Sequence, residues 1–444
     1  MISDVHIILR HSFSLLVLNF IWFTFPCFSY CQDVRSTIDN GAASIYYLHW
    51  TDPAPIPIEL ENQTPWHPQA VFRNDTLFLA FETHAVHGPE KYLAQDVYVM
   101  QYHNGSWSIP VNVSRSSASS AHPRLALTGA GPVAALHLIW GEQVTPESRL
   151  AGPPRPIAPD AVFYAAFKNG SWTRPRSLFQ INKRSIQFPY RLIRDGESSL
   201  HFIFSAPDPI NKIHQIFYIQ KQKNTDTWSI PGHIGSGFDP DLIRLEDNRL
   251  LMVYTRADSA WARRVRGRDV NSIFVKRSVD GGVTWSKDFL VQRSGSEPAY
   301  SPHLATDGKG NVHLFWQQDV DGDRWPDTIC HAYSADDTTW TAAKELLDTE
   351  KLTEGYPISF EMTGTPDGNI HAIITWGKGP GSFSSELFYT WWDGTRWQRL
   401  QPLFNFQLTG LPRLLYDEGG DRLHLLFRAG TEKEQHLYHS VAER

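Results

Sequence analysis

The sequence predicts an all-β fold, a ring of four-stranded sheets of the β-propeller type, on three observations. A unit of four short strands recurs seven times between residues 60 and 441, a proline opens each unit, and a tryptophan follows a polar or glycine-containing turn in most units. The opening prolines, at intervals of 51 to 66 residues, are Pro68, Pro123, Pro189, Pro240, Pro302, Pro357 and Pro412. Because one unit cannot cover its own apolar faces, neighbouring units are expected to stack around a ring.

Each unit contains two strand pairs. The first pair reads, for example, HPRLALTGAGPVAALHLIW at residues 122–140 and SPHLATDGKGNVHLFW at residues 301–316. The second pair carries the turn and the tryptophan, as in VFYAAFKNGSW, which ends at Trp172. We therefore expect one propeller domain over residues 44–444 with seven blades, six being the alternative count.

The two ends of the chain predict how the ring closes. The seventh unit stops after its third strand, EQHLYHSV at residues 434–441, and an unassigned strand-like segment, SIYYLHWTDPAPIPIEL, lies at residues 44–60. We expect this N-terminal segment to complete the last blade.

The first residues indicate the compartment. Residues 12–28, SFSLLVLNFIWFTFPCF, are almost wholly apolar and are followed by small and polar residues, which is typical of a signal peptide over residues 1–31. An uncleaved membrane anchor is the alternative. Either way we expect a secreted or cell-envelope protein, and the formal charge of −6 excludes a basic surface for nucleic acid.

One turn carries a family resemblance. Residues 278–285 read SVDGGVTW, in which Gly281 and Gly282 allow positive φ, Asp280 can bond the backbone, and Trp285 can cover the turn. The spelling resembles the Asp box, or BNR repeat, of the sialidase-like β-propellers. That resemblance implies a glycan-acting protein with an arginine cluster for a sugar carboxylate, a tyrosine nucleophile paired with a glutamate, and an aspartate acid/base. Seven-bladed relatives include polysaccharide lyases and glycan-binding lectins.

The candidate site follows from the repeat. The first strand of every propeller blade lines the central channel, so the residues beside the opening prolines are expected to converge there. As substrate-binding residues we predict Arg124, Arg191, Arg413, His122 and Gln69, and as catalytic residues Asp241, Tyr190, His303 and Glu361. A structural role, tying blades across a wet channel, is the alternative; the chemical variety from blade to blade favours function.

Two other groups of residues have side chains of the types that bind metal ions. The histidines in the second strands, His137, His201, His313, His371 and His424, recur in one frame and are predicted to be packing residues or residues that form hydrogen bonds between blades. The loop QQDVDGDRWPD instead places Asp319, Asp321, Asp323 and Asp327 at a spacing that suits Ca²⁺. A solvated acidic turn is the alternative there.

These observations favour an enzyme, a glycoside hydrolase or polysaccharide lyase that acts on an extracellular acidic glycan at the channel mouth. A non-catalytic lectin and a partner-binding scaffold are the alternatives, because blade loops can bind either kind of ligand. We expect a monomer that uses no organic cofactor, and Ca²⁺ is the ion predicted for the acidic loop.

Overall fold

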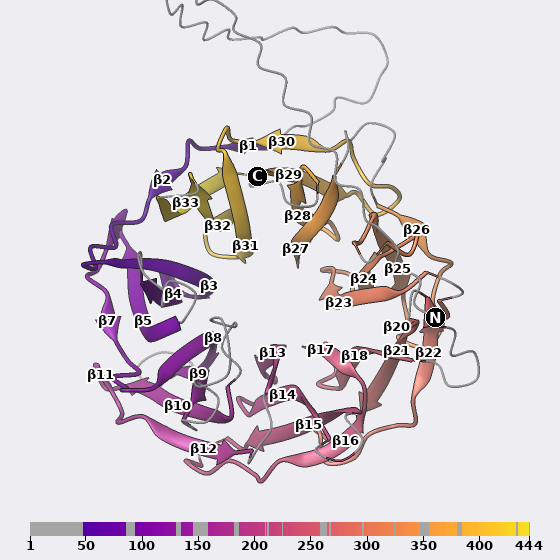
Figure 1. Ribbon diagram of the computed structural model, residues 1–444, viewed down its shortest axis with the longest axis horizontal. Helices are drawn as coiled ribbons and strands as arrows, with labels where there is room; N and C mark the ends of the chain where they lie inside the picture. The colour runs from indigo at the N-terminus through magenta and orange to yellow at the C-terminus, as the bar shows by residue number, and fades with distance from the viewer. Residues whose placement is uncertain are drawn as a thin grey trace, which may run out of the picture. The chain divides into compact units, whose positions relative to one another are not determined.

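The computed structural model describes residues 48–85, 94–129, 135–144, 159–181, 186–208, 210, 213–223, 225–257, 264–265, 268–294, 297–323, 325–346, 355–379, 384–431 and 434–443. These residues form seven antiparallel sheets arranged in a ring and contain no helix (Figure 1). No membrane-spanning helix is therefore found among them. The predicted signal peptide, residues 1–31, and residues 44–47 of the predicted closing segment lie outside the described residues.

Each sheet is one blade, and each follows the chain outward from the channel. Blade 1 holds β3 (Gln63–Arg73), β4 (Thr76–Ala85), β5 (Ala94–His103), β6 (Ser106–Trp107) and β7 (Val111–Asn112). Blade 2 holds β8 (Ser119–Thr128), β9 (Ala135–Gln143), β10 (Ala161–Lys168), β11 (Ser171–Trp172) and β12 (Arg176–Gln180). Blade 3 holds β13 (Gln187–Arg194), β14 (Leu200–Pro207), β15 (His214–Lys221) and β16 (Gly232–Ser236).

The remaining blades repeat this order. Blade 4 holds β17 (Phe238–Arg244), β18 (Leu250–Ala257), β21 (Asn271–Ser278) and β22 (Phe289–Gln292), with the small hairpin of β19 (Arg264–Val265) and β20 (Arg268–Asp269) inserted. Blade 5 holds β23 (Ala299–Thr306), β24 (Val312–Gln318), β25 (Thr328–Ser334) and β26 (Lys344–Glu345). Blade 6 holds β27 (Tyr356–Gly364), β28 (Ile370–Gly377), β29 (Ser385–Trp392) and β30 (Gln401–Leu403).

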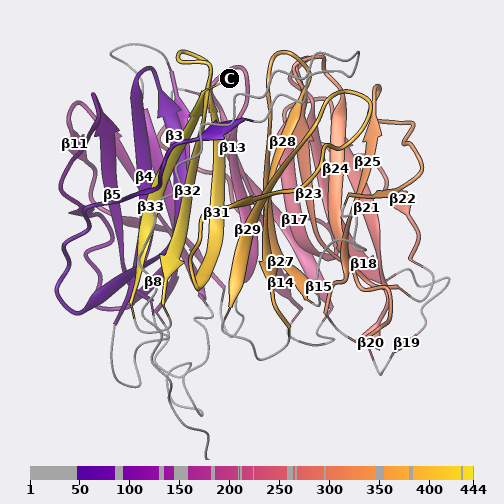
Figure 2. The same ribbon diagram turned by 90° about the horizontal axis from the view of Figure 1, so that it is seen from above.

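Blade 7 shows how the ring closes. It holds β31 (Leu408–Asp417), β32 (Arg422–Gly430) and β33 (Gln435–Glu443), and β33 pairs with β1 (His49–Trp50) and β2 (Ala54–Pro55) from the other end of the chain. The prediction of seven blades closed by an N-terminal strand is thus confirmed. Figure 1 shows β1 and β2 beside β33 at the ring's outer edge, and Figure 2 shows the strands from the side.

The apolar core lies between the blades and not in the channel. Seven clusters of buried side chains occur, and each joins two neighbouring sheets. The cluster between blades 1 and 2, for example, unites Phe78 and Val97 with Leu125 and Trp140. Packing between the blades therefore leaves the inner edges of the first strands free to carry polar residues.

A β-bulge shapes the inner strand of most blades. The residue before the opening proline has positive φ at His67, His122, Asp239, Ser301 and Leu411. The strand register shifts at these same places, so that this residue and the proline are left out of the ladder. Proline fits such a bulge because it has no N–H to lose, and pairing resumes at the residue that follows it.

The turn at residues 278–285 is held by its own side chains, as its sequence predicts. Asp280 Oδ1 accepts hydrogen bonds from Ser278 Oγ at 2.8 Å and from the Thr284 N–H at 2.9 Å. The Gly282 N–H donates to Ser278 Oγ at 2.7 Å, and the Trp285 ring meets Tyr218 of blade 3 edge to face at 5.5 Å. The turn therefore also joins two blades.

Candidate functional site

A cavity of about 220 Å³ lies in the channel and is lined by all seven blades. The residues that follow the opening prolines supply much of its wall, because the bulge in each inner strand sets them at the same level. Of the site residues predicted from the sequence, those that line the cavity are Gln69, Arg124, Tyr190, Arg191, Asp241, His303, Glu361 and Arg413. His122 is not part of the wall; its ring stacks behind Phe188, which does line the cavity, at 4.3 Å.

Two of the three arginines are neutralised by carboxylates of the neighbouring blade. Arg191 Nε lies 2.9 Å from Asp241 Oδ1, and Arg413 forms an ion pair with Glu361. Asp241 also accepts hydrogen bonds from the N–H groups of Leu242 and Leu304 at 2.9 and 2.8 Å. These pairs join blades 3 and 4 and blades 6 and 7 across the channel wall.

Arg124 differs from the other two arginines. Its Nε donates to the Tyr190 carbonyl and its Nη1 to the Pro123 carbonyl, both at 2.8 Å, and no carboxylate among the described residues lies within ion-pair distance. Only 4% of the residue is exposed, and burial lowers the pKa of Arg124 to about 10, so the guanidinium keeps its charge at neutral pH. Its cationic plane lies 4.9 Å from the centre of the Phe188 ring. The cavity wall therefore holds a buried positive charge that lacks a counter-ion.

His303 is the neutral base of the cavity. Burial lowers the pKa of its imidazole to about 4, and the nearby Asp241 carboxylate acts in the opposite direction. Its Nδ1 lies 3.7 Å from Asp241 Oδ2, and its ring meets Phe360 edge to face at 4.9 Å. At neutral pH the ring is uncharged and can accept a proton.

Tyr190 lines the cavity, but its hydroxyl contacts the backbone of blade 2. It donates toward the carbonyls of His122 at 2.7 Å and Ala121 at 3.3 Å, and it accepts from the Gly141 N–H at 2.9 Å. Burial raises the pKa of the phenol above its usual value. These contacts make Tyr190 a link between blades 2 and 3, and the attack that was predicted for its hydroxyl would first require them to break.

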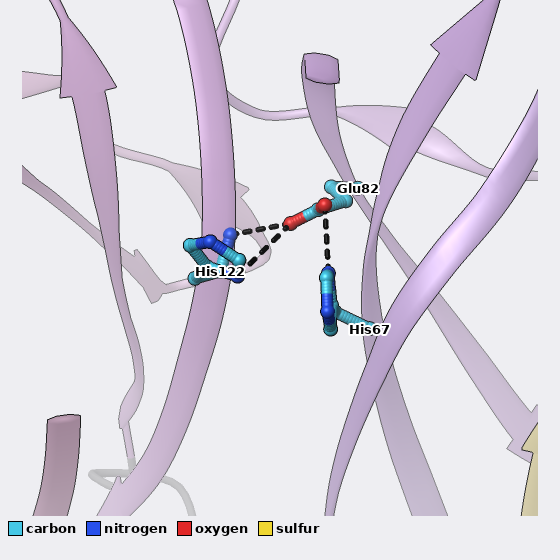
Figure 3. A group of neighbouring side chains, drawn as sticks. All are labelled: His67, Glu82 and His122. Atoms are coloured by element: carbon cyan, nitrogen blue, oxygen red, sulfur yellow. Dashed lines mark hydrogen bonds and ion pairs between the residues drawn. The ribbon is translucent and has the colours of Figure 1, made fainter. Parts of the chain in front are cut away.

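A cluster of histidines around one carboxylate, which the sequence did not predict, lies beside this cavity. The Glu82 carboxylate, in the second strand of blade 1, accepts hydrogen bonds from the ring of His67 at 2.7 Å and from the ring of His84 at 2.8 Å. It also accepts one from the backbone N–H of His122 at 2.5 Å. Figure 3 shows His67 and His122 approaching the same carboxylate from two strands. Burial alone would raise the pKa of the Glu82 carboxyl, but these histidines hold it well below its usual range. The repeat contained a signal for this cluster, since histidine precedes the opening proline only in blades 1 and 2.

The acidic loop of blade 5 brings together three of its four predicted ligands. Carboxylate oxygens of Asp319, Asp321 and Asp327 lie within 4.8 Å of one another. Asp323 is outside this group, and its Oδ1 accepts from the Trp325 N–H at 2.8 Å. Calcium binding by this loop stays a prediction.

The second-strand histidines are packing residues, as predicted, but their Nδ1 hydrogen bonds lie within one blade and not between blades as the alternative prediction had it. Each bonds through Nδ1 to a third-strand ring, and the pairs are His137–Tyr164, His201–Tyr218, His313–His331, His371–Tyr389 and His424–His439. These histidines are therefore part of the fold and lie away from the cavity.

No protein-family model matches the sequence, and no curated protein matches it. Solved structures do resemble the fold. One is a protein of unknown function from Dyadobacter fermentans, with a TM-score of 0.52 and 13% identity over 89% of this chain and 99% of that chain. Another is an ulvan lyase of polysaccharide lyase family PL25, also solved bound to -[GlcA(1-4)Rha3S]-, with a TM-score of 0.58 and 12% identity over 87% of this chain and 95% of that chain. At these identities the likeness shows a shared β-propeller fold alone.

Proposed function

We propose that the protein is a polysaccharide lyase that binds an acidic sugar of an extracellular glycan in the central cavity. The observation that carries this proposal is Arg124, a buried guanidinium in the cavity wall that has no carboxylate partner among the described residues. A buried charge is costly unless it is paired, so a site of this kind favours a ligand that brings an anion. A sugar carboxylate also matches the planar fork of arginine.

The cavity favours elimination because its wall holds both an uncharged base, His303, and a guanidinium, Arg124, that can neutralise a sugar carboxylate. In a uronate, a guanidinium bound to the C6 carboxylate acidifies the proton on C5 by stabilising the charge that develops when that proton leaves. His303 accepts the proton, the C5–H electron pair forms the C4–C5 double bond, and the bond from C4 to the leaving oxygen breaks. The leaving oxygen takes a proton from water, and His303 returns its proton to solvent.

Three other wall residues position these groups in this mechanism. Asp241 holds Arg191 and lies beside His303, and Tyr190 presents its carbonyl to Arg124. Glu361 fixes Arg413. Hydrolysis is less well supported because it needs one carboxyl as a protonated acid, whereas Asp241 and Glu361 are both ion-paired to arginines.

The likeness to solved structures supports the proposal through the fold, since an ulvan lyase has a similar fold and was solved with a glucuronate-containing ligand. Exposed rings beside the cavity suit a longer glycan. Phe188 is 40% exposed in its wall, and the ring of Trp325, 43% exposed, lies at a tilt 4.8 Å from the ring of Tyr356, two residues before the wall residue Ile358. The predicted signal peptide at residues 1–31 would deliver the enzyme to extracellular polysaccharide.

The test is incubation of the full chain with purified uronate-containing polysaccharides, sulfated and unsulfated, beside neutral glycans. New reducing ends together with the ultraviolet absorbance of a C4–C5 double bond are expected from the acidic glycans alone. Reducing ends without that absorbance would replace the lyase with a hydrolase. Binding without cleavage would make the protein a lectin, and neither binding nor cleavage of any acidic glycan would overturn the proposal.

A further inference from the structure

The cluster around Glu82 departs from the pattern of the repeat. The residues with the same register relative to the bulge are Gly141, Ser205, Thr255 and Gln317 in blades 2 to 5, all uncharged, and Arg428 in blade 7. Glu82 is a carboxylate in this position, and only 1% of it is exposed. Four blades therefore fold without a charge at this position, so the repeat does not require the carboxylate of Glu82.

Histidines surround this carboxylate from two blades. His67 and His84 both contact Glu82 Oε1, while the His122 Nδ1 lies 3.8 Å from Oε2 and has no hydrogen-bond partner. His122 is nevertheless mostly buried, with 14% of its side chain exposed. An unpaired ring nitrogen that faces a buried carboxylate lacks the partner that such a polar atom normally has.

We propose that His67, Glu82 and His122 bind one zinc ion at the junction of blades 1 and 2. One donor atom from each of the three residues lies within 4.8 Å of the others. The Nδ1 of His67 lies 2.7 Å and the Nδ1 of His122 lies 3.8 Å from a Glu82 oxygen. Ligand atoms around a tetrahedral zinc with bonds of about 2.0 to 2.1 Å lie about 3.4 Å apart, between these two distances. Two imidazoles with one carboxylate suit zinc better than calcium or magnesium, which prefer oxygen ligands.

The place of the ion gives it a role at the cavity. His67 lines the cavity and keeps 20% of its side chain exposed, whereas Glu82 lies behind it. An ion held here would leave a coordination position on the side of His67 and would add positive charge to a wall that already holds Arg124. It therefore suits an anionic group of the ligand, beyond the carboxylate that Arg124 binds.

The experiment measures zinc alone, so it does not depend on any glycan activity. The full chain, without a polyhistidine tag and stripped by a chelator, is titrated with Zn²⁺ in competition with a chromophoric chelator. We expect one ion per chain and a raised melting temperature on binding. The key variant is His67→Asn, because His67 has a φ of 47° and asparagine tolerates that conformation.

His67→Asn and Glu82→Gln should each weaken the zinc affinity at least about a hundredfold, the upper range for loss of a supporting residue alone. His103→Asn is the matched control, since His103 is an exposed histidine of the same blade that bonds Thr76, and it should bind zinc as the wild type does. Wild-type affinity no tighter than that of His67→Asn would overturn the proposal. So would an equal loss in His103→Asn. Equal melting temperatures of the metal-free proteins would show that the variants are folded.

Discussion

Two histidines of blade 5, ten residues apart, have opposite environments. His303, in the inner strand, keeps 27% of its side chain exposed in the cavity and lies beside a carboxylate of another blade. His313, in the next strand, is 1% exposed, and its ring lies parallel to that of His331 with the Nδ1 3.0 Å from the partner's Nε2. The residue type is the same, but one ring faces a ligand-sized space and the other is enclosed between its own blade and Trp392 of blade 6.

The repeat distinguishes these two roles. The His313 position is histidine in five blades, and each of these histidines bonds the third strand of its own blade. The His303 position, after the opening proline, carries Gln, Arg, Tyr, Asp, His, Ile and Arg around the ring. A residue that the fold needs recurs from blade to blade, whereas residues that form one asymmetric site differ because each contributes once.

The strongest test of this contrast is to change each histidine to asparagine. His303→Asn should lower turnover of an acidic glycan by about a hundredfold to ten-thousandfold, the usual contribution of a general base, with the melting temperature kept. His313→Asn should lower the free energy of unfolding by about 1 to 3 kcal/mol because it removes the hydrogen bond between the His313 Nδ1 and the His331 Nε2. Turnover at a temperature where both variants are folded, together with urea denaturation, separates the two effects. If His313→Asn lost turnover without losing stability, the division of roles would be wrong.

A substitution of Arg124 tests whether the inner-strand residues bind the ligand. Arg124→Ala should weaken binding of an acidic oligosaccharide by about 2 to 5 kcal/mol, because the ligand anion would lose its buried partner. Arg396→Ala is the control, since Arg396 is 76% exposed and should change binding little. Calorimetric titration of both variants measures the difference. An equal effect in the two variants would move the anion site away from the channel.

The role of the buried histidine pairs inside the blades can be tested by lowering the pH. Burial lowers the pKa of His331 to about 2 and of His439 to about 3, while the unfolded chain keeps histidine near 6.5. Both states are neutral above pH 6.5; as the pH falls, the unfolded state binds protons first, so stability decreases toward the folded pKa values. At pH 5 each such histidine should lower the free energy of unfolding by about 2 kcal/mol.

His331→Tyr sharpens this prediction, because tyrosine occupies the matching place in blades 2, 3 and 6. Urea denaturation between pH 7 and pH 5 should show a smaller loss of stability in the variant than in the wild type. An identical pH dependence would mean that the histidine pair is not the acid-sensitive element.

The smallest expected effect concerns the acidic loop of blade 5, which is part of neither the inner-strand position of His303 nor the second-strand position of His313. If Asp319, Asp321 and Asp327 bind calcium, the ion at ten times its dissociation constant should stabilise the fold by about 1.4 kcal/mol. Asp321→Asn should remove the shift, whereas Asp323→Asn should keep it because Asp323 lies outside the cluster. Thermal unfolding with calcium and with chelator is the measurement, and a shift that survives Asp321→Asn would exclude this loop.

The architecture and most of the cavity wall could be predicted because the opening prolines mark one register in every blade. That register brought Gln69, Arg191 and His303 to the same level without any knowledge of distances. It could not give the direction of the Tyr190 hydroxyl or the pairing of Arg191 with Asp241, which depend on how two blades pack. Glu82 was missed because it lies in a second strand, where the repeat predicts packing, and only its neighbours in space reveal its chemistry.

The closing pair of β1 and β33 makes the ends of the chain interdependent during synthesis. Arg413 Nε donates to the Pro68 carbonyl at 3.1 Å across the same junction, so a wall residue of the last blade is anchored on the first. A nascent chain that has completed six blades still lacks Arg413, the strand that receives β1, and one wall of the cavity. The site is therefore complete only after the seventh blade has been synthesised and has paired with β1.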